Sequence, residues 1–154
     1  VNIALIHKRK PVLGVVAVPV TGEVYYGVVG AGAYLEQLPV INNRLVVENY
    51  QLPATGQRPL ITASANLKAK GLRVVASRSH MNDDTQQFID ALNEPTLVSS
   101  GSSLKFMLLI NGQADVYPRF APTMEWDTAA AHAIVNSAGI KVYQAHSNEE
   151  LVYN

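Results

Sequence analysis

The residue with the clearest potential for chemistry is Asp127, which follows Trp126 and precedes an alanine-rich stretch. From Trp126 onward, apolar residues recur with the spacing of a one-sided helix, at Ala129, Ala130, Ala133 and Ile134. The pattern predicts a helix over 126–138 and places Asp127 in its first turn. We expect Trp126 to hold the backbone so that the carboxylate is aimed. That carboxylate can bind a metal ion, or it can simply be stabilised by the helix dipole.

Polar residues also follow three successive predicted strands in the second half of the chain. Residues 77–80 follow the first of these strands, residues 99–103 the second, and Arg119 the third. In open α/β sheets, ligands bind outside the carboxyl ends of the strands. The sequence therefore predicts one sheet edge and one shared cleft for Ser77, Ser79, Gly101, Ser102, Arg119 and Asp127.

The turn that contains Gly101 and Ser102 leads from a predicted strand into a predicted helix over 102–111. Such a turn presents backbone N–H groups to an anion such as phosphate, although Ser102 or Ser103 could instead be an ordinary helix cap. Lys105 lies one turn inside the same helix. Its ammonium group can reach back to an anion at the helix start, or it can lie on a solvated face.

Arg119 and His80 are the other candidate ligand contacts. The guanidinium of Arg119 is a planar fork that matches two phosphate oxygens, and the alternative is a surface ion pair with Asp115 or Glu125. His80 has polar neighbours in the sequence, which is unusual for a core histidine. It either contacts a ligand or caps the helix that follows.

The remaining histidines and the serines near His80 give weaker signals. We expect three histidines to be exposed: His7, His132 and His146. His132 lies off the apolar face of its predicted helix, and His7 and His146 have no carboxylate pattern around them. Neither Ser77 nor Ser79 lies in a Gly-x-Ser-x-Gly turn, so a covalent serine mechanism is not expected.

Local patterns divide the chain into two predicted segments, 1–60 and 61–154. The first begins with β-rich runs over 2–7, 11–18 and 24–29, which predict an antiparallel meander that glycines interrupt at its end. The second alternates strands and helices over 72–76, 84–93, 96–99, 102–111, 114–117, 126–138 and 141–143. This alternation predicts an α/β layer with helices covering a sheet, so the chain as a whole is α+β.

Composition excludes several classes of function. Twelve basic residues balance twelve acidic residues, so no overall field attracts nucleic acid or a membrane surface. There is no cysteine, which excludes disulfides and thiolate metal sites. No apolar run is long enough for stable membrane insertion, and no secretory leader is recognisable, so we expect a cytoplasmic protein. The oligomeric state cannot be predicted.

The motif Trp-Asp-Thr-Ala-Ala at 126–130 resembles a signature of the inositol monophosphatase superfamily. Read with residues 77–80 and 101–105, the segment 115–127 resembles the 3'(2'),5'-bisphosphate nucleotidase branch of that superfamily. The resemblance implies a layered α/β sandwich and a Mg²⁺-dependent phosphatase. The implied substrate is a small nucleotide bisphosphate, adenosine 3',5'-bisphosphate, which would lose its 3'-phosphate.

The resemblance also implies a role for each candidate residue. Asp127 would ligate one Mg²⁺ ion and so take part in catalysis, and His80 would contact the nucleotide side of the substrate. The implied substrate-binding residues at the phosphate are Gly101, Ser102, Lys105 and Arg119. Alanine stands at two positions where the family is expected to have glycine, Ala121 and Ala131.

Two acidic motifs of the superfamily are missing from this chain. They are an upstream Gly-Glu-Glu segment and an Asp-Pro-Ile/Leu-Asp-Gly-Thr motif, and the first half of the chain has no aspartate. We therefore expect a fragment that is poorly active alone. An inositol monophosphatase or a sugar bisphosphatase is an alternative, and so is a non-catalytic binding or scaffold domain that lost its metal motifs.

Overall fold

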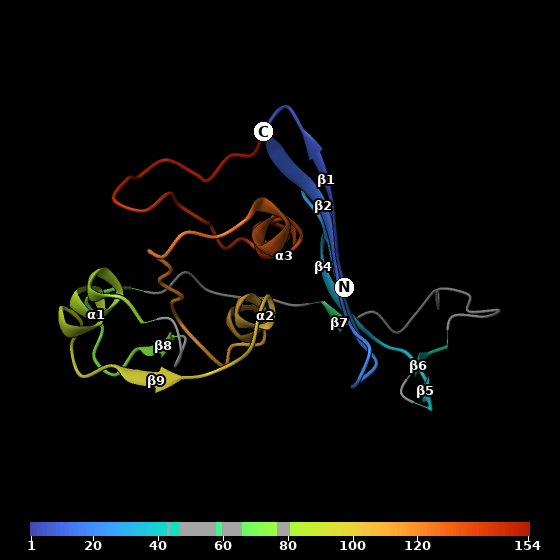
Figure 1. The fold of residues 1–154 in the computed structure, drawn as a ribbon, viewed down its shortest axis with the longest axis horizontal. Helices are drawn as coiled ribbons and strands as arrows, with labels where there is room; N and C mark the ends of the chain where they lie inside the picture. The colour runs from blue at the N-terminus through green and yellow to red at the C-terminus, as the bar shows by residue number, and fades with distance from the viewer. Residues whose placement is uncertain (43, 47–57, 60–65, 77–80) are drawn as a thin grey trace.

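The computed structural model describes residues 1–42, 44–46, 58–59, 66–76 and 81–154. An antiparallel sheet with the strand order β1-β2-β3-β4-β7 forms the first part of the fold (Figure 1). Its strands are β1 (Asn2–His7), β2 (Lys10–Val18), β3 (Glu23–Val28), β4 (Gly32–Gln37) and β7 (Arg58–Pro59). A separate two-stranded sheet contains β5 (Val40–Ile41) and β6 (Arg44–Leu45). Valine and tyrosine side chains, which favour a pleated surface, dominate β2 and β3.

The predicted meander is confirmed for the runs over 2–7, 11–18 and 24–29, but β4 was not predicted. Gly30 and Gly32 suggested that the meander ended there, because glycine weakens strands. Both glycines instead have positive φ angles, 90° and 104°. This conformation, which glycine adopts at little cost, lets the chain reverse from β3 into β4.

The second part of the fold contains the helices. A helix, α1 (Asp83–Asp90), connects two short parallel strands, β8 (Arg73–Val75) and β9 (Thr96–Val98), and α2 (Leu104–Ile110) and α3 (Glu125–Ser137) follow. The three helices predicted over 84–93, 102–111 and 126–138 are therefore confirmed. No helix in the described part of the chain is long and apolar enough to cross a membrane.

Two predicted strands of the second part form only single bridges. Residues 114–117 pair with β8 at one parallel bridge. The ladder does not extend further because the Arg73 backbone N–H donates to the Asp115 carboxylate, at 2.7 Å, instead of to a strand carbonyl. Residues 141–143 form one antiparallel bridge to Glu150 instead of a further strand. The elements follow one another in the predicted order, but the third and fourth predicted strands of this part do not form regular strands.

α3 lies directly on the sheet (Figure 1). Glycine permits this close approach, because a Cβ at Gly14 would collide with the Ala130 carbonyl oxygen. The core that results contains Val16, Tyr25, Ala33, Phe106, Met107, Ile110, Ala130, Ala131, Ile134 and Val135. This core contains residues from both predicted segments, 1–60 and 61–154. The predicted boundary at residue 60 lies outside the described residues, and the division into 1–60 and 61–154 stays a prediction.

Candidate functional site

Two cationic side chains, Lys105 and Arg119, meet at the ring of Tyr117. Lys105 is only 6% exposed, and its ammonium nitrogen lies 6.0 Å from the centroid of the Tyr117 ring. Burial lowers the pKa of Lys105, and the positive charge of Arg119 lowers it further. Arg119 also hydrogen bonds the Tyr117 side chain, which offsets part of the rise in pKa that burial causes for this tyrosine. A solvated position for Lys105 is therefore wrong, and the two repelling cations favour an anion between them.

Arg119 retains a hydrogen-bond donor that the described residues do not use. Its Nη2 donates to the Pro122 carbonyl oxygen at 3.3 Å, whereas its buried Nε has no partner among the described residues. The alternative role of Arg119, an ion pair with Asp115, is wrong, because Arg73 binds that carboxylate through Nη2 at 2.7 Å and through Nε at 3.0 Å. This pairing lowers the pKa of Asp115. The unused donor fits an acceptor on a ligand, since an unpaired buried N–H is unfavourable.

Asp127 lies in the first turn of α3, as predicted, and its side chain is exposed. A hydrogen bond from the Thr123 hydroxyl reaches it at 3.5 Å, which is the weak limit for such contacts. Its negative charge contributes to the raised pKa of Tyr117, after the larger effect of burial, so it acts on the same cluster as the two cations. Trp126 does not hold the turn as expected, because it is 70% exposed and the buried face begins at Thr128.

The carboxylate of Asp127 suits one ligand position of Mg²⁺. This ion prefers hard oxygen ligands, and the described residues place only the weak Thr123 hydrogen bond on that carboxylate. Across the described ranges, no group of three or more His, Cys, Asp or Glu side chains could hold a metal ion. Asp127 therefore fits as one ligand, and a complete site needs others.

The turn before α2 is open to solvent, with Gly101 and Ser102 both exposed. Ser102 has a positive φ angle of 45°, which is uncommon for a residue with a side chain. Ser103 occupies the cap position, but its hydroxyl donates to Asn2 Oδ1 at 3.1 Å and caps nothing. Ordinary capping by Ser103 is therefore wrong.

Two residues predicted for the sheet edge, Arg119 and Asp127, lie near enough to Tyr117 to affect its pKa. Lys105 lies near the ring of Tyr117, whereas Arg119 lowers and Asp127 raises the pKa of the Tyr117 hydroxyl. The turn with Gly101 and Ser102 directly precedes α2, the helix that carries Lys105. Residues 77–80 include the other expected members of this edge, among them His80, and they lie outside the described residues. Their place at the site stays a prediction.

A cleft of 630 Å³ adjoins the cation cluster. Tyr117 and Arg119 line it, together with Phe120 and His146, while Lys105 and Asp127 are not part of its lining. The rings of Phe120 and His146 have centroids 5.1 Å apart, and this histidine is exposed, as predicted. Flat rings beside a guanidinium suit a ligand that carries both an aromatic ring and an anion.

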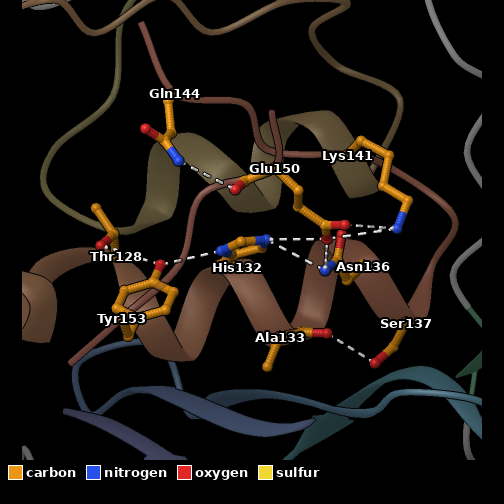
Figure 2. A network of polar contacts seen from close by, with 9 residues as sticks. All are labelled: Thr128, His132, Ala133, Asn136, Ser137, Lys141, Gln144, Glu150 and Tyr153. Atoms are coloured by element: carbon orange, nitrogen blue, oxygen red, sulfur yellow. Dashed lines mark hydrogen bonds and ion pairs between the residues drawn. The ribbon is translucent and has the colours of Figure 1, made fainter. Parts of the chain in front are cut away.

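His132 is completely buried, which contradicts the prediction that it is exposed. Its ring lies between the Tyr153 hydroxyl, 3.0 Å from Nδ1, and the Asn136 amide, 3.2 Å from Nε2 (Figure 2). The same amide donates to the Glu150 carboxylate at 2.6 Å. The C-terminal segment, residues 150–154, therefore covers this face of α3, which helical periodicity alone could not reveal.

Burial lowers the pKa of His132 to about 4, and the nearby Glu150 carboxylate only partly opposes this shift. The unfolded chain takes up the proton near pH 6.5, above the pH at which the folded chain does. The stabilisation is thus complete above about pH 6.5 and is lost as the pH falls toward 4. We expect the free energy of unfolding to fall by roughly 2 kcal/mol between pH 7.5 and pH 5.

Urea unfolding at the two pH values measures this loss. His132→Gln should remove most of the pH dependence, whereas the same substitution at the exposed His7 should leave it unchanged. An equally steep loss in His132→Gln would show that another group controls stability in this range.

The sequence analysis did not identify Tyr117 as part of the site, and it wrongly placed His132 on the surface. Tyr117 lies two residues before Arg119. In an extended segment, residues two apart face the same side, and this spacing could have placed the two side chains together. His132 is four residues from both Thr128 and Asn136, which is the spacing of neighbours on one helix face. Those polar neighbours could have suggested a buried network.

Comparison with known proteins places this geometry in a family. The model of the inositol monophosphatase family matches residues 1–154. The 3'(2'),5'-bisphosphate nucleotidase CysQ of Salmonella typhimurium is 43% identical over 143 residues, which cover 93% of this chain and 50% of that protein. The protein of the same name from Escherichia coli strain K12 is 40% identical over an equal length.

Solved structures agree with these matches. The crystal structure of CysQ from Bacteroides thetaiotaomicron, described as a bacterial member of the inositol monophosphatase family, covers 99% of this chain with a TM-score of 0.78 and 41% identity. The match covers 56% of that structure. An inositol monophosphatase from Zymomonas mobilis, at 20% identity and a TM-score of 0.62, shares the fold.

The chain spans about half the length of the curated relatives it matches. Within that span, the expected mixed α and β fold is confirmed, and the expected resemblance is confirmed by identities of 40% or more over nearly the whole chain. The chain belongs to the inositol monophosphatase family.

Proposed function

We propose that the protein to which this chain belongs is a Mg²⁺-dependent phosphomonoesterase. It removes the 3'-phosphate of adenosine 3',5'-bisphosphate to give AMP and phosphate. The observation that carries this proposal is the meeting of two cations, Lys105 and Arg119, near the exposed carboxylate of Asp127. The nucleotidases at 40% identity or more support the nucleotide substrate, because their names specify it.

In this proposal the cation cluster binds phosphate oxygens. The unused Nε donor of Arg119 gains an acceptor, and an anion between Arg119 and Lys105 removes their repulsion. Gly101 and Ser102 offer further contacts from the open turn, and His80 contacts the nucleotide side. Asp127 holds one Mg²⁺ ion, and bound Mg²⁺ supplies an activated water and a positive charge for the leaving oxygen.

The neighbouring cleft distinguishes the substrate classes. Its rings, Phe120 and His146, offer aromatic faces against which a base can pack, whereas a polyol would need hydroxyl partners. The lining therefore supports a nucleotide over the alternative substrates, an inositol phosphate or a sugar bisphosphate. A scaffold role would not require a buried Lys105 and a half-buried Arg119 that form no ion pair with any of the described residues.

Replacing Arg119 with lysine tests the phosphate contact. Lysine keeps the charge but not the fork, so we expect the KM of the full-length enzyme for adenosine 3',5'-bisphosphate to rise about 10- to 100-fold. The affinity for inorganic phosphate, measured by calorimetry without metal, should fall in parallel. Arg44→Lys, at an exposed position in β6, is the matched control. An unchanged KM in Arg119→Lys would remove Arg119 from the site.

A further inference from the structure

The last two residues of the chain, Tyr153 and Asn154, contact both the turn between β1 and β2 and the first turn of α3. The Tyr153 backbone N–H donates to the Arg9 carbonyl oxygen at 2.9 Å, and Arg9 Nε returns a hydrogen bond to the Tyr153 carbonyl oxygen at 3.2 Å. The Tyr153 side chain is buried against α3, where its hydroxyl donates to Thr128 Oγ1 at 3.3 Å. The backbone N–H of Asn154 donates to the Glu125 carboxylate at 3.0 Å. Tyr153 thus connects the turn between β1 and β2 to the first turn of α3.

The first turn of α3 depends on these contacts. Met124 occupies the cap position, and its side chain accepts no hydrogen bond from the backbone N–H groups of the turn. A helix start without a side-chain cap frays readily, because its first N–H groups lack partners. The C-terminal segment contacts this turn on both sides of Asp127 in the sequence, at the exposed Glu125 and at the buried Thr128.

The hydrogen bonds run in one consistent direction. Asn136 donates to His132 Nε2, so Nδ1 carries the proton of the neutral ring and donates to the Tyr153 oxygen (Figure 2). The Tyr153 hydroxyl then donates to Thr128, whose hydroxyl donates to the Glu125 carbonyl oxygen at 3.3 Å. The chain of donors ends two residues before Asp127. Because His132, Tyr153 and Thr128 are buried, water cannot easily replace a hydrogen bond that is lost between them.

We propose that Tyr153 is a positioning residue for Asp127. Its hydroxyl fixes the first turn of α3 against the C-terminal segment, so that the Asp127 carboxylate is held ready for its ligand. This inference rests on the proposed role of Asp127 in binding Mg²⁺. A purely structural role for Tyr153 would change stability and leave the affinity for Mg²⁺ as it was.

The experiment compares Tyr153→Phe with Tyr25→Phe in the full-length protein. Tyr25 is equally buried, in the sheet, and its hydroxyl bonds Glu23 and Asn111. Both variants should lower the Tm by similar amounts. Only Tyr153→Phe should weaken Mg²⁺ binding, by roughly 3- to 10-fold in calorimetry, and speed hydrogen exchange of the amides of residues 125–128 in the metal-free protein.

Substitutions at Thr128 test the same link from the helix. Thr128→Ser keeps the hydroxyl and should retain wild-type affinity for Mg²⁺, whereas Thr128→Val should weaken it as Tyr153→Phe does. The double variant with Tyr153→Phe should bind no more weakly than either single variant, since one link is broken in each. If Tyr153→Phe does not fold, Thr128→Val carries the same expectation.

Two results would overturn the inference in different ways. Wild-type Mg²⁺ affinity in Tyr153→Phe, with a Tm lowered as in Tyr25→Phe, would leave Tyr153 a structural role only. If Asp127→Asn binds Mg²⁺ as well as the wild type does, the proposed function fails, and this inference fails with it. Binding that depends on Asp127 but not on Tyr153 overturns the inference alone.

Discussion

Replacing Asp127 with asparagine is expected to lower the kcat of the full-length enzyme by roughly 10³-fold or more, with almost no change in Tm. Asparagine preserves the shape of the side chain and removes the charge that holds the metal ion. Among the described residues, the exposed carboxylate accepts one weak hydrogen bond, from Thr123 at 3.5 Å. Loss of this charge should therefore lower the free energy of unfolding by only about 0.3–1 kcal/mol, the size of a favourable helix-dipole interaction.

The measurement is kcat at saturating Mg²⁺ beside a thermal unfolding curve. Asp84→Asn is a matched control, because Asp84 is also an acidic residue in a first helical turn, that of α1. It loses the same dipole interaction and should retain full turnover. Unchanged kcat in Asp127→Asn would reduce Asp127 to a residue that stabilises its helix.

The 154-residue chain alone is expected to hydrolyse adenosine 3',5'-bisphosphate roughly 10³-fold more slowly than the full-length protein, or slower still. One carboxylate holds Mg²⁺ poorly, and the described residues offer no cluster of metal-ligating side chains around Asp127. Weak phosphate binding should persist, because Lys105 and Arg119 are both retained.

A phosphate-release assay on both proteins at equal concentration measures the difference. Calorimetric titrations with Mg²⁺ and with inorganic phosphate separate the loss of the metal from the loss of the anion site. Comparable turnover by the two proteins would mean that this chain assembles a metal site by itself. Glu125, in the same turn as Asp127, would then be the first residue to test.

The sequence predicted the elements whose patterns are local. The alternation of branched residues predicted β1, β2 and β3, and apolar spacing predicted α3 to within one residue at each end. The positions of Asp127 and Arg119 after successive elements predicted that they would share a site. Their common influence on Tyr117 is consistent with that prediction.

Features that depend on distant partners could not be predicted. His132 looked exposed because its polar partners, Tyr153 and Glu150, come from the C-terminal segment. The sequence left open whether Lys105 reaches an anion or lies on a solvated face, because nothing local indicates the Tyr117 ring near its ammonium group. Trp126 fits the helical spacing of a buried residue, yet the first turn faces outward there and leaves it exposed.

The most direct test of the proposed function is product analysis with the full-length protein. The protein is incubated with Mg²⁺ and with adenosine 3',5'-bisphosphate or an inositol monophosphate at equal concentrations, and the products are separated. The account predicts rapid formation of AMP and phosphate from the nucleotide and slow release from the inositol ester. Faster hydrolysis of the inositol ester, or no Mg²⁺-dependent hydrolysis of either compound, would contradict it.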